Sequence, residues 1–286
     1  MTAKHKRNDD IFSVMIRSYN DLTKSETKVA DYVLRNKHQV HLQSISALAA
    51  ACDVSEATIS RFCHTLGCTG FNEFKLATVQ AGSTAEPMDM GPDLYSTVLP
   101  TDSLQQKCRK LCYISMDALQ QTLGELELDK MDAAVKLLSQ ARSVFCFGQG
   151  NSSIVAENAW GRFCMVSPKF HFIPNSQLQA DTASLLTEED VVLYFSFSGS
   201  VRELMEVGTI LKKRGGKLIL VTQFPNSAGA ALADVVLLCG ANESPSQQCS
   251  IAAKISQLFI VDVLFHEYCG QNRITPTYQD PLEQLT

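Results

Sequence analysis

The sequence predicts two domains of different fold class: an all-α domain at the N-terminus, then an α/β domain with a five-stranded parallel sheet flanked by helices. The length of 286 residues exceeds one average domain. Helical periodicity dominates residues 11–76, and five short apolar runs separated by helix-length segments begin at residue 143. With 45% apolar and 19% charged residues, the chain can bury a full core, which excludes wholesale disorder.

Charge is distributed unevenly along the chain. Residues 1–80 hold ten Lys and Arg against eight Asp and Glu, whereas the remainder holds 15 against 22, for a total of −5. A locally basic first domain attached to an acidic second one is typical of a small nucleic-acid-binding module joined to a larger domain with another task.

The chain contains no obvious membrane or export segment. The first ten residues are basic and polar with no apolar stretch behind them, and no run of about 18 apolar residues occurs. We therefore expect a cytoplasmic protein whose ten cysteines are reduced. Cys63 with Cys68 and Cys108 with Cys112 form no paired Cys-x-x-Cys set, so we expect no metal site.

The first domain, residues 1–77, is expected to contain two helices that meet at a tight turn within residues 44–67. Asp53 occupies the turn, where a residue that tolerates left-handed backbone geometry is needed, and Ser55 is placed to cap the second helix. Apolar residues recur at helical spacing on one face of each helix: Ile45, Leu48 and Cys52 on the first, and Ile59, Phe62 and Leu66 on the second. This pattern indicates a helix-turn-helix.

The other face of the second helix carries small and hydrogen-bonding residues close to its N-terminus. A recognition helix presents such residues to the major groove of DNA, where Arg61 would contact a guanine edge or a phosphate. The alternative is an ordinary solvated helix face. The candidate DNA-binding residues are Ser55, Ala57, Thr58, Arg61, His64 and Thr65.

Residues 78–103 lose both periodicities and are rich in Gly, Pro and small polar residues, which predicts a linker. The second domain, residues 104–286, is expected to begin with helices over 103–123 and 129–141, the latter capped by Asp129. A long apolar helix from about Cys249 to Tyr268 closes the domain. The five runs between them predict parallel strands at 143–147, 169–173, 191–195, 217–221 and 235–238.

Two turns of the second domain are candidates for anion binding. Gly148 to Ser153 leads from a strand into a helix, whose N-terminal amides attract anions. The dinucleotide fingerprint G-x-G-x-x-G is excluded, because Ser153 replaces its third glycine. The second turn places Ser196 and Ser198 at a strand end beside Gly199. Simple helix capping is the alternative for both turns, and the candidate residues are Gly150, Asn151, Ser152, Ser153, Ser196, Ser198, Gly199 and Ser200.

Taken together, these motifs make the chain resemble the RpiR/MurR family of bacterial regulators. Residues 11–77 are similar to its helix-turn-helix domain, and residues 104–270 are similar to its sugar isomerase (SIS) domain, which has flavodoxin-like layering. The resemblance covers almost the whole chain and lies in residues 22–33, 54–63, 66–71, the Gly148 turn, 196–199 and 253–262.

The resemblance implies operator DNA as a partner, dimerisation through the SIS domain and control by a phosphorylated sugar, with no cofactor. By motif position, Ser152, Ser196 and Ser198 would hold the phosphate. SIS domains usually read Ser-x-Ser-Gly-x-Thr, and Val201 stands at the threonine position here. One hydroxyl of the usual set is therefore missing, and Ser200 is a possible replacement.

Two alternatives remain open at this stage. One is a SIS-type sugar-phosphate isomerase or lyase, which needs an acid/base pair, but the spacing of the candidates selects none of them: His171, Glu243, His266 and Glu267. The other is a DNA-binding protein in which the SIS domain is only a dimerisation scaffold, an idea that Val201 favours. We expect a regulator rather than an enzyme.

Overall fold

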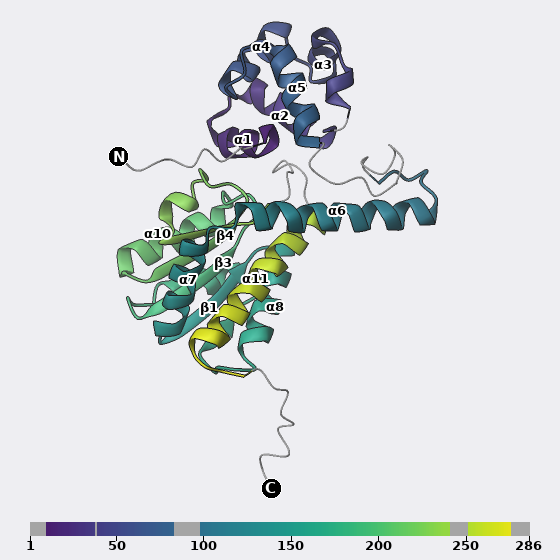
Figure 1. The fold of residues 1–286 in the computed structure, drawn as a ribbon. Helices are drawn as coiled ribbons and strands as arrows, with labels where there is room; N and C mark the ends of the chain where they lie inside the picture. Colours follow the sequence, from purple (N-terminus) through teal and green to yellow (C-terminus); the bar gives the residue numbers. More distant parts are fainter. Residues whose placement is uncertain (1–9, 38, 83–97, 241–250, 276–286) are drawn as a thin grey trace, which may run out of the picture. The chain divides into compact units, whose positions relative to one another are not determined.

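The computed structural model describes residues 10–37, 39–82, 98–240 and 251–275, and the chain divides into two compact units (Figure 1). The described helices and the parallel sheet confirm the predicted fold class: a helical region followed by an α/β domain. None of the described helices is long and apolar enough to cross a bilayer.

The helical unit is built around α1 (Ile11–Ser18), α2 (Lys24–Arg35), α3 (Ile45–Ala51), α4 (Glu56–Thr65) and α5 (Phe71–Gly82), with short 3₁₀ turns at Tyr19–Asp21 and Val40–Leu42. Its core is apolar and fully buried: the ring of Phe62 on α4 meets the ring of Phe74 on α5 edge-on at 5.8 Å. Helix α5 continues to Gly82, so its last turn falls within the range 78–103 expected as linker.

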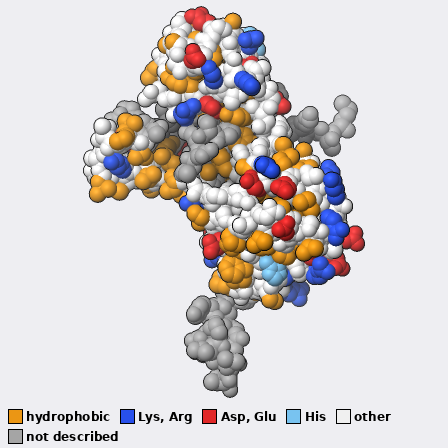
Figure 2. All heavy atoms as spheres, turned by 180° about the vertical axis from the view of Figure 1, so that it is seen from behind, with side chains coloured by type: hydrophobic (Ala, Val, Ile, Leu, Met, Phe, Trp, Pro, Cys, Tyr) orange, Lys and Arg blue, Asp and Glu red, His pale blue; other side chains and the backbone are white. Residues whose placement is uncertain are grey.

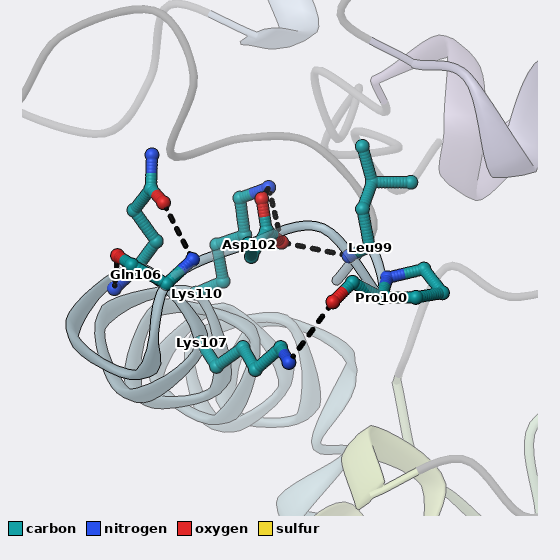
Figure 3. A network of polar contacts seen from close by, with 7 residues as sticks. Leu99, Pro100, Asp102, Gln106, Lys107 and Lys110 are labelled. Atoms are coloured by element: carbon teal, nitrogen blue, oxygen red, sulfur yellow. Dashed lines mark hydrogen bonds and ion pairs between the residues drawn. The ribbon is translucent and has the colours of Figure 1, made fainter.

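The segment before α6 (Leu104–Glu125) is fixed by polar contacts (Figure 3). Lys110 Nζ lies 2.8 Å from a carboxylate oxygen of Asp102, and both side chains are buried. The same carboxylate accepts a hydrogen bond from the Leu99 amide at 2.7 Å. The hydrogen bonds and charge of Lys110 hold the pKa of Asp102 below its usual range. Along α6 itself, apolar side chains remain exposed (Figure 2): Leu104, Leu111, Met116, Leu119 and Leu123.

The α/β unit contains the predicted five-stranded parallel sheet, and its strands lie in the order β2-β1-β3-β4-β5. The strands are β1 (Ser143–Gly148), β2 (Phe170–Phe172), β3 (Asp190–Phe195), β4 (Lys217–Thr222) and β5 (Val235–Leu238). All six residues of β3 are buried, as expected for a central strand of a parallel sheet that is covered on both faces.

Helices cover both faces of this sheet. Buried side chains of α7 (Leu128–Gln140), α8 (Asn151–Phe163) and α11 (Ile251–Gln271) pack on one face. Those of α9 (Ser176–Ala183) and α10 (Arg202–Arg214) pack on the other. Asp129 was expected to cap α7, but the N-cap is Glu127 and it makes no side-chain cap bond. Leu128 precedes Asp129 inside the helix, which places Asp129 in the first turn.

The strand order indicates where a ligand would bind on this sheet. From β1 the chain proceeds through α8 to β2 on one side, and from β3 it proceeds through α10 to β4 on the other. The order therefore reverses between β1 and β3. In open parallel sheets, ligands bind outside the carboxyl ends of the strands at such a point. The two candidate turns follow β1 and β3 and so lie at this reversal.

Candidate functional site

The helix-turn-helix turn has the geometry that the sequence predicts. Asp53 adopts a left-handed conformation with φ of 53°, and the Val54 amide donates to the Ala49 carbonyl at 3.0 Å, closing the turn after α3. Ser55 caps α4, because its hydroxyl accepts from the Thr58 amide at 3.3 Å. Lys28 on α2 pairs with the Asp53 carboxylate at 2.9 Å, which lowers the pKa of Asp53 and ties the turn to α2.

The predicted reading face of α4 is only partly exposed. Ala57, Arg61, His64 and Thr65 are exposed, as is the capping residue Ser55. Thr58 is instead buried; its hydroxyl lies 3.0 Å from that of Ser55 and accepts from Arg61 Nη2 at 3.4 Å. Thr58 therefore supports the start of α4 and the Arg61 side chain from inside the domain.

Contacts between α2 and α4 fix the orientation of the reading face. Glu26 accepts a hydrogen bond from Thr65 at 3.1 Å while its other oxygen accepts from the Thr23 amide at 3.0 Å. Burial would raise the pKa of Glu26, but the hydrogen bonds from Thr23 and Thr65 and the charge of Arg61 outweigh it and lower the pKa. Thr65 thus has a structural partner beside any role on DNA.

The Gly148 turn joins β1 to α8 closely. A side chain at Gly148 would put its Cβ 2.5 Å from the Ser152 carbonyl oxygen, so the turn accepts only glycine there without rearrangement. Gly150 has φ of 55° and is the N-cap of α8, with Asn151, Ser152 and Ser153 in the first turn. The amides of Ser152 and Ser153 donate to the carbonyls of Gln149 and Gly150, at 3.0 and 3.1 Å. These two amides are therefore already engaged, in contrast to the free helix terminus that was expected.

The Ser196 turn is closed by its own hydroxyls. Ser196 is buried, and its Oγ accepts from the Gly199 amide at 3.2 Å. Half-buried Ser198 accepts from the Ser200 amide at 3.4 Å, and the exposed Ser200 hydroxyl donates to the Ser198 carbonyl at 3.2 Å. A serine hydroxyl that accepts one bond still has a proton to donate. Ser196 and Ser198 can therefore donate to an oxyanion without loss of these bonds.

Gly199 lets the turn after β3 pack closely against the loop after β4. It has φ of 61°, and a Cβ there would lie 2.2 Å from Ser227 Oγ and 2.8 Å from Thr222 Oγ1. Its carbonyl accepts from the Gly229 amide at 2.8 Å, and Thr222 Oγ1 donates to the Phe197 carbonyl at 3.0 Å. The turn after β3 is thus packed tightly on the loop after β4.

Val201 is the N-cap residue of α10 and provides no side-chain cap bond. A hydroxyl at this position, as in the usual threonine, would serve the N-terminus of α10. Ser200 is exposed and its hydroxyl bonds within the turn, so it does not take over the capping role.

Two buried amide side chains at this part of the sheet were not singled out from the sequence. Gln223 follows β4 directly and Gln257 lies in α11, and both are almost fully buried. A polar residue just beyond a buried strand, the signal that identified Ser196, was also present at Gln223, two residues after the predicted strand. For Gln257 the signal was a polar side chain on an apolar helical stripe.

The candidate acid/base residues of the enzyme alternative are dispersed. His171 is exposed on β2 with its ring 4.9 Å from that of Phe145. His266 and Glu267 are exposed near the C-terminal end of α11, where Glu267 accepts from Gln271 at 3.0 Å. Glu243 lies outside the described residues. None of the three described residues is in contact with the serine turns through a hydrogen bond or ring contact.

Two protein-family models match successive parts of the chain. Residues 12–85 match the model of the helix-turn-helix domain of the rpiR family, and residues 137–267 match the model of the SIS domain. The fold and the two domain matches therefore define a helix-turn-helix transcriptional regulator with a C-terminal SIS domain.

Curated relatives identify the family. The chain is 34% identical over 247 residues to a helix-turn-helix transcriptional regulator of Haemophilus influenzae, covering 86% of this chain and 85% of that one. It is 31% identical to the regulator YbbH of Bacillus subtilis, over 90% of this chain and 89% of that one. The chain belongs to the RpiR family. It also matches 38% of the bifunctional protein glk of Burkholderia thailandensis, at 31% identity.

Solved structures share the architecture. NanR of Vibrio vulnificus, complexed with ManNAc-6P, aligns with a TM-score of 0.57 at 27% identity, covering 92% of this chain and 93% of that one. The sugar isomerase domain of an RpiR transcription factor from Sphaerobacter thermophilus aligns with a TM-score of 0.54 at 20% identity, over 59% of this chain and 93% of that one. The second likeness concerns the fold alone.

Proposed function

We propose that this chain is an operator-binding regulator whose affinity for DNA is controlled by a phosphorylated sugar bound in the SIS domain. The observation that carries the proposal is the position of the two serine-rich turns at the reversal of strand order. Hydroxyl donors beside a helix N-terminus suit a phosphate group, and no metal is required for this chemistry. The similarity to NanR, whose structure holds ManNAc-6P, supports a ligand of this class.

In this proposal the phosphate is held by Ser152, Ser196 and Ser198, and Gly150, Asn151, Ser153, Gly199 and Ser200 shape the two turns. The DNA is read by α4, with Arg61 on its exposed face and Ser55, Ala57, His64 and Thr65 beside it. The protein acts as a homodimer in the cytoplasm, because operators lie there and one helix-turn-helix reads only a half-site.

We propose ligand binding rather than turnover. A catalyst needs an acid and a base within hydrogen-bond reach of the same substrate. His171 lies on β2, whereas His266 and Glu267 lie near the C-terminal end of α11, so the candidates come from different elements. The placement of these groups supports a sensor.

The proposal is tested with Ser196→Ala combined with Ser198→Ala. Sugar phosphates are first screened for thermal stabilisation of the wild type, since a ligand that binds the folded state raises its apparent stability. Operator titrations with and without the best sugar phosphate then compare wild type and variant. We expect the variant to bind the operator normally and to need at least tenfold more ligand, because a lost hydrogen bond to a charged group costs about 1.5–3 kcal/mol.

A matched control is Ser115→Ala combined with Ser184→Ala. Both hydroxyls donate to backbone carbonyls of their own helical segments, at 2.7 and 2.6 Å, outside the two turns. The control should respond like the wild type. A normal ligand response by the Ser196 and Ser198 variant would place the phosphate elsewhere, and a wild type that no sugar phosphate stabilises would refute the sensor function itself.

A further inference from the structure

Two buried glutamines of the α/β unit carry amide atoms that have no hydrogen-bond partner among the described residues. Gln223 is 4% exposed and Gln257 is 2% exposed. Within the described part of the chain, the side-chain Nε2 and Oε1 of Gln223 form no hydrogen bond. The same is true of Nε2 of Gln257. Buried polar groups are nearly always hydrogen-bonded, because water can no longer satisfy them. Each of these amides therefore lacks a hydrogen-bond partner among the described residues and needs one from outside them.

Gln223 lies directly beside the Ser196 turn. The backbone N–H of Gln223 donates to the Phe197 carbonyl at 3.1 Å, which extends the pairing of β3 with β4 beyond the last strand pair, Phe195 with Val221. Side chains alternate between the two faces of a sheet. Gln223 therefore shares the face of Val221, which is covered by α7, α8 and α11. Its backbone partner is the residue between Ser196 and Ser198.

Gln257 approaches the same place from α11. This helix packs on the same face of the sheet through Ile260, Val261 and Leu264. Beyond its C-terminal end, Asn272 donates to Ser139 Oγ at 2.8 Å, and Ser139 closes α7 just before β1 begins. The C-terminal end of α11 is therefore at the amino edge of the sheet, so the helix runs toward that edge from the carboxyl edge.

The lengths of the two elements place Gln257 level with the end of β4. From 257 to 272 the chain spans about 22 Å at about 1.5 Å per helical residue. From 217 to 223 it spans about 20 Å at about 3.3 Å per strand residue. Gln257 and Gln223 thus belong to the same layer, at the carboxyl edge, on the same face of the sheet.

We propose that Gln223 and Gln257 bind the uncharged, hydroxyl-bearing body of the sugar whose phosphate lies at the Ser196 turn. This inference rests on the proposed function. A primary amide offers two donors and one acceptor oxygen, which matches hydroxyl groups that both donate and accept. The two glutamines are then determinants of which sugar is recognised, whereas the serines recognise only the phosphate that all such sugars share.

The test uses the full chain with Gln223→Met or Gln257→Met, since methionine keeps the length and shape of the side chain without its amide. The probes are ManNAc-6P, glucose 6-phosphate and ribose 5-phosphate, with inorganic phosphate as the probe that has no sugar body. For the sugar phosphate that stabilises the wild type most, we expect each variant to bind at least tenfold more weakly. Affinity for inorganic phosphate should change less than twofold, because the serine turn is intact.

Stability of the ligand-free protein separates recognition from a structural role. Loss of an amide that has no partner should leave the melting temperature unchanged or raise it. The matched control is Gln179→Met, which removes a buried amide that donates to the Gly148 and Ile173 carbonyls at 3.3 and 2.7 Å, and which should lower the melting temperature.

Three outcomes would overturn the inference. Sugar-phosphate affinity within twofold of the wild type in both variants would refute it while the sensor function stands. A fall in melting temperature as large as that of Gln179→Met would assign the two glutamines a structural role. A wild type that binds inorganic phosphate and none of the three sugar phosphates would refute both this inference and the proposed sensor function.

Discussion

At the scale of single residues, the turn after β3 depends on a glycine for two separable reasons. Gly199 and Gly150 both have positive φ, but only Gly199 faces neighbouring atoms, whereas nothing lies within 4 Å of a Cβ added at Gly150. The pair therefore distinguishes backbone strain from steric collision within one domain.

We predict that Gly199→Ala destabilises the protein far more than Gly150→Ala. The second change costs about 1–2 kcal/mol from left-handed strain alone. The first adds the collision with Ser227 and Thr222, which displaces the loop after β4 and brings the cost to about 3 kcal/mol or more. Urea unfolding measured by circular dichroism checks this, and equal midpoints for the two variants would contradict the packing described for the turn.

Arg61 is the exposed cation of the reading face. We predict that Arg61→Ala weakens operator binding by about 1–3 kcal/mol if the side chain reads a guanine, with a smaller and sequence-independent loss if it contacts phosphate. The control is Arg35→Ala on α2, which also removes one exposed positive charge. Fluorescence anisotropy on operator and scrambled duplexes separates these outcomes, and unchanged operator affinity would remove Arg61 from the reading face.

At this scale, some features of the candidate sites could be predicted from the sequence and others could not. Local rules identified Asp53, Ser55 and the Gly148 turn, because backbone conformation and capping depend on near neighbours in the chain. Burial of Thr58 and the position of Gln257 depend on contacts across the fold. Thr58 was placed on the solvent side of α4 because its spacing allows that, whereas the packing of α4 on neighbouring helices buries it.

At the scale of elements, one buried carboxylate ties the starts of two adjacent strands. Asp190 begins β3, and its carboxylate accepts from Arg142, just before β1, at 3.1 and 2.7 Å. The Thr187 amide donates to it at 3.0 Å. Burial would raise the pKa of Asp190, but the bonds from Thr187 and the bonds and charge of Arg142 outweigh burial and lower the pKa.

We predict that Asp190→Asn lowers the free energy of unfolding at pH 7 by about 1.5–3 kcal/mol, as expected for charge-assisted hydrogen bonds. A carboxyl group whose pKa is lower in the folded state stabilises above its unfolded pKa, and that contribution is lost as pH falls through the folded pKa. The difference between wild type and variant should therefore shrink below about pH 4. Urea unfolding at pH 7 and at pH 3–4 measures it.

The control for Asp190 is Glu189→Gln. Glu189 lies 3.3 Å from the same guanidinium, but both partners of that pair are exposed, so its removal should change stability by less than about 1 kcal/mol at pH 7. A penalty for Asp190→Asn that stays constant from pH 7 to pH 3 would contradict the role assigned to its charge.

Most of the elements followed from periodicity. Five apolar runs became five parallel strands, and the helices after 103 and 128 lie close to their expected bounds. Periodicity could not set the end of α5 at Gly82, because residues 77–82, with Ala, Thr and Gly among them, are compatible with a helix or a linker. It also could not give the strand order, which depends on how the crossovers pack.

At the scale of the whole molecule, a single α4 reads too few base pairs for a specific site. We predict that two chains bind one duplex whose half-sites are related by inverted symmetry. Light scattering should give twice the chain mass of 31.4 kDa. The exposed apolar side chains of α6 and α8, among them Leu111 and Ile154, are available to such a dimer.

Footprinting and a titration of stoichiometry check the DNA side of this prediction. A duplex that carries one half-site serves as the control and should bind much more weakly than the full site at the same ionic strength. A monomer in solution that protects one asymmetric half-site with full affinity would contradict the dimer.

The reversal of strand order between β1 and β3 bears on how such a sensor acquires a new effector. Both turns begin where their strands end, and the apolar side chains that hold the sheet together lie in the strands and helices behind them. On the proposed function, substitutions at Ser200 or Gln223 should therefore alter what is recognised at little cost to the scaffold. This separation makes the domain a suitable starting point for biosensors, in which libraries at a few strand-end codons are selected for new inducers with a reporter gene.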